Sequence, residues 1–356
     1  MRQARKLTVL NVAFPLLPVT AGSSGGAEQI LYLLERGVAD AGHRSIVVAA
    51  KGSDIAGELI ETPAVTSDIT EEVRADAQRK HARTIEKALS GTHVDLIHFH
   101  GLDFSTYRPR KALPQLATLH LPAAWYPASI FEERDVQLNC VSQAQATSSP
   151  RPGLPVVCNG IDTQRYRFDT GNRQHVLWLG RICPEKGVDI ALRVALRLDL
   201  PMIVAGAVHP FRDHEIYFAE KVRPLLDSKR KYAGAVDLDI KIKLLSEASC
   251  LLIPSLVAET SSLVAMEAIA SGTPVIAFRS GALPEIVEHG KTGFIVDSED
   301  EMAATLGQIG KISPEVCRST ALERFEASRM IEGYLRLYDQ LIDAHGTGGS
   351  LFPKCL

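Results

Sequence analysis

Short apolar segments alternate with longer amphipathic segments along almost the whole chain. Apolar runs of about four to eight residues between polar or glycine-containing loops are typical of strands that are buried on both faces of a parallel sheet. The predicted strands cover residues 7–14, 46–50, 95–99, 116–119, 140–142, 156–158, 176–179, 202–205, 232–236, 250–253, 275–278 and 294–296. The predicted helices cover residues 27–41, 71–89, 188–196, 209–230, 240–248, 263–270, 299–309 and 328–342. This alternation predicts an α/β protein with doubly wound parallel sheets.

Length and composition add a domain count and exclude some partners. A chain of 356 residues is long for a single core, which predicts two domains. The net charge of −3 gives no reason to expect nucleic acid as a partner. The apolar run near the N-terminus imitates a signal peptide, but Asn11, Pro15 and Pro18 interrupt it, so we expect a strand there. The six cysteines are scattered without a CxxC pair, which favours reduced thiols in a cytoplasmic protein.

A glycine-rich loop connects the first predicted strand to the first predicted helix. Gly25 and Gly26 end this loop directly before helix 27–41. Paired glycines let a backbone approach a phosphate or a sugar closely. The loop lacks the G-x-G-x-x-G pattern of dinucleotide-binding proteins, and no acidic residue is placed to hold an adenine ribose. A dinucleotide-dependent oxidoreductase is therefore the weaker interpretation.

Two cations follow the strand at residues 176–179. Gly180 and Arg181 come directly after this strand, and Lys186 follows after a tight loop. The carboxyl end of a parallel strand is where open α/β sheets bind ligands. Arginine offers a planar fork of donors and lysine a compact charge. The spacing places the two cations where they can hold a diphosphate.

Two glutamates flank the start of helix 263–270. Glu259 precedes the helix, and Glu267 lies about two turns inside it. The free backbone N–H groups at the N-terminus, around Ser262 and Leu263, favour an anion. Two acids around an anion site suit a ligand that carries several hydroxyls and a phosphate, and sugar nucleotides fit that description.

Histidines mark the carboxyl ends of two predicted strands in the first half. His98 and His100 share a face at the end of strand 95–99, so a metal clip is conceivable. No third ligand follows at the spacing of a metal motif, and we predict no metal site. His120 follows strand 116–119, again at the ligand-binding edge.

The stretch from residue 254 to 293 resembles the signature of family-four retaining glycosyltransferases, which have the GT-B fold. The matching residues are Pro254-Ser255, Glu259, Glu267-Ala268, Ser271-Gly272-Thr273-Pro274-Val275-Ile276 and the segment 281–287. Three further segments are similar to motifs of the same family: Gly25-Gly26-Ala27-Glu28, Gly180-Arg181 with Lys186-Gly187, and Asn159-Gly160-Ile161-Asp162.

The resemblance implies two Rossmann-like domains that face a cleft. Residues 1–160 would form the acceptor-side domain and residues 161–327 the nucleotide-sugar domain. A C-terminal helix, residues 328–345, would cross back to the first domain, and residues 346–356 would be a flexible tail.

The resemblance also implies roles for the candidate residues. Arg181 and Lys186 would hold the diphosphate of the donor. Glu259 would orient the sugar, and Glu267 would bind the ribose. His120, in a Thr-x-His segment, would lie near the transferred sugar. The donor-binding set would be Gly25, Gly26, Gly180, Arg181, Gly206, Val236, Lys186, Ser262, Leu263 and Glu267, with Val236 in the segment that meets the base.

The implied activity is transfer of a sugar from a UDP- or GDP-sugar to an acceptor hydroxyl, with retention of anomeric configuration and without a metal or another cofactor. The acceptor would be a sugar, a lipid or a small molecule, and a peripheral membrane contact is conceivable. Ser261-Ser262 stands where the family usually has Phe-Gly, which leaves the donor open. A nucleotide-sugar epimerase and a non-catalytic nucleotide-sugar-binding protein are the alternatives.

Overall fold

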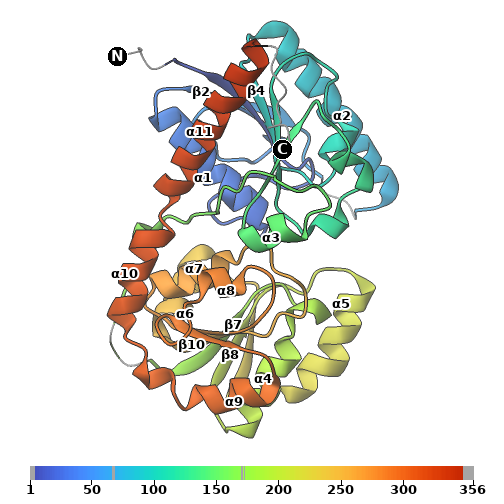
Figure 1. Ribbon diagram of the computed structural model, residues 1–356. Helices are drawn as coiled ribbons and strands as arrows, with labels where there is room; N and C mark the ends of the chain where they lie inside the picture. The colour runs from blue at the N-terminus through green and yellow to red at the C-terminus, as the bar shows by residue number, and fades with distance from the viewer. Residues whose placement is uncertain (1–4, 66–68, 170, 172, 348–356) are drawn as a thin grey trace. The chain divides into compact units, whose positions relative to one another are not determined.

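The computed structural model describes residues 5–65, 69–169, 171 and 173–347, and its chain divides into two compact units (Figure 1). Unit 1 consists of Met1–Asn159 together with Ala327–Leu356, and unit 2 of Gly160–Glu326. The division lies within one residue of the boundaries expected from the sequence. The expected tail, residues 346–356, lies outside the described residues except for its first two positions.

Unit 1 contains one sheet of six parallel strands. Its strands are β1 (Thr8–Val12), β2 (Arg44–Ala50), β3 (Glu58–Thr62), β4 (Leu96–Phe99), β5 (Gln115–Leu119) and β6 (Gln137–Cys140). Its α-helices are α1 (Gly26–Asp40), α2 (Glu71–Gly91), α3 (Gln143–Ser148) and α11 (Ala327–Gly346). The strand order is β3-β2-β1-β4-β5-β6.

Unit 2 repeats this architecture. Its strands are β7 (His175–Leu179), β8 (Met202–Ala205), β9 (Arg230–Gly234), β10 (Ala248–Ile253), β11 (Val275–Phe278) and β12 (Gly293–Val296). Its α-helices are α4 (Val188–Arg197), α5 (Arg212–Tyr217), α6 (Leu238–Glu247), α7 (Leu263–Ala270), α8 (Leu283–Ile286), α9 (Glu299–Leu306) and α10 (Pro314–Arg324). The sheet is parallel, with the order β12-β11-β10-β7-β8-β9.

Both sheets therefore have the doubly wound order 3-2-1-4-5-6, counted along each unit. Successive strands are added toward one edge of the sheet from β1 to β3 and toward the other edge from β4 onward, so the order reverses between β1 and β4. In unit 2 the same reversal lies between β7 and β10. Ligands of open α/β sheets bind outside the carboxyl ends of the strands at this reversal. The topology thus selects the loops after β7 and β10 as the first place to search for a site in unit 2.

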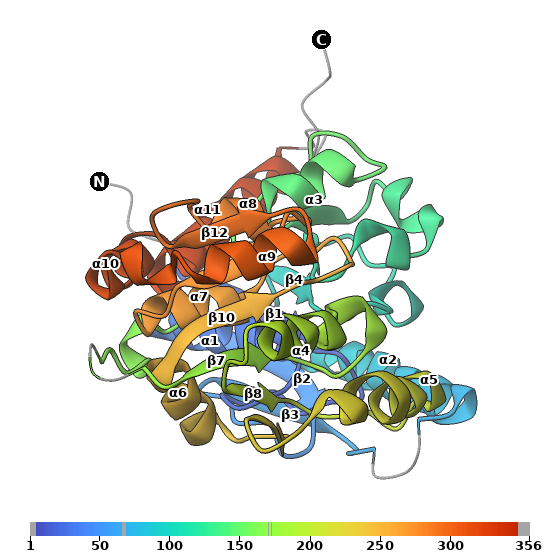
Figure 2. The same ribbon diagram turned by 90° about the horizontal axis from the view of Figure 1, so that it is seen from below.

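Helices cover both faces of each sheet because side chains alternate along a buried strand. In unit 1, Val12 and Phe99 pack with Ile85 of α2 on one face. On the other face His98 points to Tyr338 of α11, and α11 lies beside α1 (Figure 1). In unit 2, α4 packs beside α9 on one face and α7 beside α10 on the other (Figure 2).

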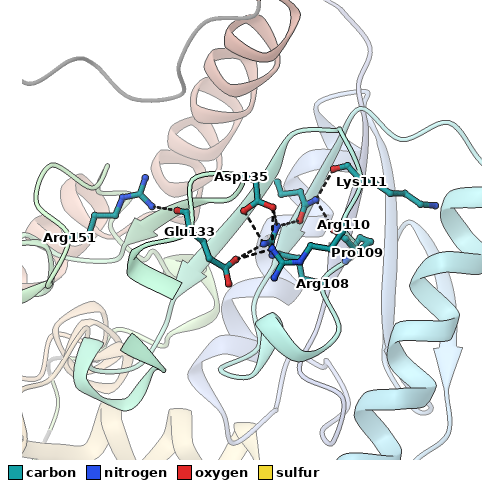
Figure 3. A network of polar contacts seen from close by, with 8 residues as sticks. Arg108, Pro109, Arg110, Lys111, Glu133, Asp135 and Arg151 are labelled. Atoms are coloured by element: carbon teal, nitrogen blue, oxygen red, sulfur yellow. Dashed lines mark hydrogen bonds and ion pairs between the residues drawn. The ribbon is translucent and has the colours of Figure 1, made fainter. Parts of the chain in front are cut away.

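In unit 1 a buried arginine, Arg108, lies at the amino ends of the strands, opposite to the ligand-binding edge of the sheet (Figure 3). The Arg108 guanidinium, 1% exposed, donates two 3.0 Å hydrogen bonds to the carboxylate of Asp135 and also contacts Glu133. It donates a further bond of 3.1 Å to Gln115, the first residue of β5. Paired bonds between guanidinium and carboxylate fix orientation as well as distance. The network therefore holds the amino ends of β5 and β6 in place.

Some predicted elements were wrong. The helix expected over residues 209–230 is replaced by α5, a π-helical turn (Phe218–Val222) and a 3₁₀ turn (Arg223–Leu225), because Pro224 cannot continue a helix. The strand expected over 156–158 is only an isolated bridge between Cys140 and Val156. Strand β3 and the helices α3, α8 and α10 were not predicted. No helix in the described part of the chain has the length and apolarity needed to cross a membrane.

Candidate functional site

The loops after β7 and β10 meet in an ion pair. Nζ of Lys186 lies 2.6 Å from Oε1 of Glu259, and the Ser255 hydroxyl donates to the same oxygen at 2.7 Å. The side chains of Lys186 and Glu259 are 26% and 11% exposed, so solvent screens the pair only partly. Two residues that the sequence predicted separately, one cation and one acid, are therefore joined at the topological reversal of unit 2.

A glycine allows the two loops to approach. Gly187 ends the turn Pro184–Lys186 with a φ of 63°, and a Cβ there would lie 2.3 Å from the backbone oxygen of Pro254. The N–H of Leu256 donates to the carbonyl of Glu185 at 2.8 Å. The positive φ and the lack of space both favour glycine at this position. The close packing of the two loop backbones thus fixes the position of the Lys186 backbone.

Gly180 and Gly206 make a second close approach, at the carboxyl ends of β7 and β8. A Cβ on Gly206, whose φ is 152°, would lie 1.7 Å from the carbonyl oxygen of Gly180. The N–H of Gly206 donates to the carbonyl of Gly234 at 2.7 Å. Val236, expected near the nucleotide base, is half-buried and follows β9 by two residues. These residues line the same strand edge as the ion pair.

The loop that carries Glu259 is held by its own backbone. The carbonyl of Glu259 accepts a 2.7 Å hydrogen bond from the N–H of Ala282. Gly281 has a φ of 53°, and a Cβ there would lie 2.1 Å from that same carbonyl oxygen. These backbone contacts fix the position of Glu259 and do not involve its carboxylate oxygens.

Helix α7 begins at Leu263, where the sequence placed it. The hydroxyl of Ser262, a buried residue, accepts from the N–H of Ala265 at 3.4 Å and so caps the helix. The first N–H groups of a helix have no acceptor within the helix and carry the positive end of its dipole. Because Glu259 lies three residues before the cap, the acid and the helix N-terminus belong to one short segment.

Glu267 is not part of the ion pair. Its Oε1 accepts hydrogen bonds of 2.7 Å from the hydroxyl of Tyr166 and of 2.7 Å from Nζ of Lys241, and its side chain is 3% exposed. Burial and the Glu267 charge together raise the pKa of the Tyr166 phenol. The sequence did not predict these two partners.

Arg181 is the most open of the predicted residues in unit 2. Its side chain is 40% exposed, and one guanidinium nitrogen lies 3.8 Å from Oε1 of Glu185 on the same loop. A loosely paired guanidinium at a strand edge is available to an anionic ligand. Two other residues of this loop, Cys183 and Glu185, form a group with His214 that could hold a metal ion.

In unit 1 the glycine pair stands at the start of α1. Gly26 is the first residue of the helix, and a Cβ on Gly25 would lie 1.9 Å from Oε2 of Glu28. The Glu28 carboxyl group thus fills the space that a side chain at position 25 would need. Burial raises the pKa of the Glu28 carboxyl, although a backbone hydrogen bond opposes the shift.

His120 is hydrogen-bonded to a second histidine. Nδ1 of His100 lies 3.1 Å from Nε2 of His120, at the carboxyl ends of β4 and β5. Burial lowers the pKa of both imidazoles, that of His120 to about 3. Both rings are therefore neutral near pH 7, and one nitrogen of this pair donates while the other accepts.

The sequence missed the side chains that position the predicted acids. Ser255 supports Glu259, whereas Tyr166 and Lys241 support Glu267. Ser255 stands in the Pro-Ser pair of the recognised motif, so the signal for it was present. Tyr166 lies 101 positions before Glu267, and no local pattern connects such residues.

Solved structures with the same architecture are glycosyltransferases and related synthases. The chain superposes on sucrose-phosphate synthase from Thermosynechococcus elongatus with a TM-score of 0.79 and 18% sequence identity, covering 95% of this chain and 100% of that one. It matches the Anabaena protein HepE, solved with UDP-glucose, with a TM-score of 0.72 and 19% identity, covering 94% of this chain and 99% of that one. The fold is therefore the two-domain α/β GT-B fold, as predicted.

Sequence comparison narrows this class. Residues 173–311 match the family model for group 1 glycosyl transferases. A D-inositol 3-phosphate glycosyltransferase of Acidothermus cellulolyticus is 30% identical over 184 residues. That match spans 46% of this chain but only 40% of the relative's length. The predicted kinship with glycosyltransferases, which are transferase enzymes, is confirmed.

Proposed function

We propose that the chain is a retaining, metal-independent glycosyltransferase that moves a sugar from a UDP- or GDP-sugar to an acceptor hydroxyl. The observation that carries the proposal is the Lys186–Glu259 pair, 2.6 Å apart beside the N-terminus of α7. A cation, a helix N-terminus and a sugar-orienting acid then act on adjoining parts of one donor. The UDP-glucose bound to the Anabaena protein supports a nucleotide-sugar donor.

In this proposal the diphosphate lies against the loop that carries Arg181 and Lys186. Negative charge develops on the phosphate as the sugar departs, and preorganised cations and amides stabilise charge where it develops. Arg181 supplies a guanidinium that is 40% exposed, and Lys186 a partly buried ammonium. These cations supply the charge that a metal ion supplies elsewhere, which is why we infer that none is required.

The transfer proceeds on one face of the sugar. The bond between the anomeric carbon and the phosphate oxygen breaks, and the acceptor oxygen forms its bond on the same face. The acceptor proton passes to the departing phosphate, so the leaving group is also the base. Glu259 orients the sugar through its hydroxyls and is not assigned as a nucleophile, because its carboxylate is already held by Lys186 and Ser255.

Glu267 and His120 have supporting roles in the proposal. Only one oxygen of Glu267 is engaged by Tyr166 and Lys241 in the contacts described above, and a carboxylate can accept about four hydrogen bonds, so the other oxygen is assigned to the ribose. His120 is neutral near pH 7 and can donate or accept a bond with a sugar hydroxyl. The acceptor remains a sugar, a lipid or a small molecule.

Replacement of the two cations tests the proposal. We expect Arg181→Ala and Lys186→Ala to lower kcat by at least about a hundredfold, the scale on which a lost donor to a developing oxyanion acts. Lys311→Ala removes an exposed lysine elsewhere in unit 2 and serves as the control. Circular dichroism confirms that each variant is folded. Near-normal turnover in both cation variants would refute the assignment of the loop.

Product analysis separates the competing functions. A retaining transferase forms an acceptor product that keeps the donor sugar's configuration at every position, including the anomeric carbon, which NMR of the product reports. Epimerised donor after incubation without acceptor would instead identify an epimerase, and binding without turnover a silent binding protein. Activity abolished by EDTA and restored by Mg²⁺ would contradict metal independence.

A further inference from the structure

Three side chains with metal-ligand chemistry converge beside the cation loop of unit 2. They are Cys183 and Glu185, on the loop between Arg181 and Lys186, and His214 on α5. Their ligand atoms all lie within 4.8 Å of one another. Cys183 is buried and the other two are half-buried, so the group lies within the fold and is not a cluster of freely exposed acids.

The chemistry of this set favours a borderline-soft divalent cation. Thiolate, imidazole and carboxylate are the ligands of zinc. Three such protein ligands and one water molecule complete a tetrahedral site. With zinc bonds of about 2.0 to 2.3 Å, tetrahedral ligand atoms lie about 3.3 to 3.6 Å apart, so no pair in the group needs to contract by more than about 1.5 Å. Mg²⁺ prefers oxygen ligands and octahedral geometry, which this set does not provide.

His214 gives an independent indication of a missing partner. Its Nδ1 atom is buried and has no hydrogen-bond partner among the residues that the structure describes. Buried polar atoms of native proteins are nearly always satisfied, so a buried nitrogen without a partner on the ring that joins this thiol and carboxylate requires an explanation. A metal ion bound by this group would take an imidazole nitrogen of His214 as one of its ligands.

Helix α5 holds His214 against the loop. Tyr217, one turn after His214, hydrogen-bonds to the carboxylate of Asp189 and accepts from the backbone N–H of Asp189 at 3.2 Å. Asp189 lies in the first turn of α4, directly after the loop. The π-helical turn Phe218–Val222, which continues α5, accordingly packs against α4. The histidine therefore comes from a part of the chain that the fold already fixes beside the loop.

We propose that Cys183, Glu185 and His214 form a binding site for Zn²⁺ or a similar soft divalent cation, and that the bound ion clamps the cation loop to α5. Two of its ligands lie between Arg181 and Lys186, so occupancy restricts the segment that carries both cations. The site goes beyond the proposed sugar transfer, and its existence is independent of that activity.

Cobalt titration of the full chain tests the site. The protein is freed of metal with a chelator, the chelator is removed, and Co²⁺ is added while the visible and near-ultraviolet spectra are recorded. We expect one equivalent of Co²⁺ per chain, with a thiolate charge-transfer band and the intense bands of tetrahedral cobalt, and displacement by Zn²⁺. Cys183→Ser and His214→Gln should each weaken binding at least tenfold.

Matched variants separate this site from adventitious binding. Cys158→Ser removes an exposed thiol, and His209→Gln removes a histidine that precedes α5, so both should bind Co²⁺ like the wild type. Hydrogen exchange at residues 181–187 should slow when Zn²⁺ is bound. Wild-type affinity in Cys183→Ser and His214→Gln overturns the site, and unchanged exchange at those residues with one Zn²⁺ bound overturns the clamp.

Discussion

At the scale of single residues, Glu267 serves two requirements at once. Its side chain is almost fully buried, and Lys241, whose side chain is 13% exposed, is its ion-pair partner. A buried charge without a partner is costly, so each member of the pair makes the other tolerable. Glu267 would therefore support the fold of unit 2 whether or not a ribose is bound. Replacement of Glu267 therefore changes the stability of unit 2 as well as any contact with a ribose.

Replacement of the lysine measures the structural part of this role. Lys241→Met keeps most of the side-chain volume but leaves the Glu267 carboxylate with the Tyr166 hydroxyl as its remaining described partner. We expect the free energy of unfolding to fall by about 3 kcal/mol, measured by urea denaturation. Lys243→Met, two positions along α6 and exposed, should change it by less than about 0.5 kcal/mol. Equal midpoints for the two variants would contradict the role of the pair.

At the scale of elements, α11 is attached to the sheet of unit 1 by a buried polar network. Nδ1 of His98 lies 2.8 Å from the Tyr338 hydroxyl, and Nε2 lies 2.7 Å from the hydroxyl of Thr118. The Tyr334 hydroxyl lies 3.1 Å from the same Thr118 oxygen and accepts from Asn139 at 3.4 Å. These contacts join the three strands β4, β5 and β6 to a helix that lies 195 to 240 residues later in the chain. The network therefore specifies where the last helix docks.

Two tyrosine variants distinguish the essential bond of this network from a supporting one. Tyr338→Phe removes the partner of a fully buried imidazole nitrogen, and an unsatisfied buried group costs about 1 to 3 kcal/mol. Tyr334→Phe leaves Thr118 bonded to Asn139 and to His98, so it should cost clearly less. Urea denaturation of both variants gives the comparison. A larger loss in Tyr334→Phe would contradict the assigned order.

The elements that the sequence predicted well are those with a strong apolar signal. Helix α7 and the strands β8 and β11 have the expected boundaries because they are short, apolar except for Glu267 in α7, and have glycine or proline at or near an end. Strand β3 was missed because only Leu59 and Ile60 of its five residues are apolar, so this edge strand shows neither an apolar run nor a regular alternation. The failed helix at 209–230 shows the opposite error, a mixed pattern that was extended through Pro224.

At the scale of the whole molecule, both units follow one topology, which explains why the candidate site was largely predictable. Lys186 and Glu259 stand after β7 and β10, and these strands are neighbours in every sheet of order 3-2-1-4-5-6. Only the direct contacts of Glu259 with Lys186 and with Ser255 required the three-dimensional structure. The positions of Tyr166 and His214 depend on how the loops outside the sheet fold, and periodicity carries no information about that.

The two units should differ in acid sensitivity, because buried histidines are concentrated in unit 1. Burial lowers the pKa of His81 to about 4 and that of His120 to about 3, and it lowers the pKa of His98 and His100 as well. In unit 2 the pKa of His175 is lowered by burial, but the charge of Glu247 opposes that shift. Protonation therefore disfavours the folded form chiefly in unit 1.

The sign and the pH window follow from linkage. The unfolded state binds these protons with a pKa of about 6.5 and the folded state only at lower pH, so the stability is complete above pH 6.5 and is lost as the pH falls. For His81 alone the loss at pH 5.5 is about 1.4 kcal/mol, and the other three histidines act in the same direction. Hydrogen exchange with mass spectrometry in urea reads each unit separately. We expect unit 1 to open at lower urea concentration at pH 5.5 than at pH 7.5, while unit 2 changes less.

One variant links this prediction to a particular imidazole. Nε2 of His81 lies 3.0 Å from the carbonyl oxygen of Ala13, and the ring packs edge-on against Tyr107. His81→Gln keeps an amide donor for that carbonyl but has no proton to gain in this range. It should lower the stability of unit 1 at pH 7.5 and also reduce its dependence on pH by about 1.4 kcal/mol between pH 7.5 and 5.5. An unchanged pH dependence in this variant would exclude His81 from the transition and leave the three histidines at β4 and β5 as its source.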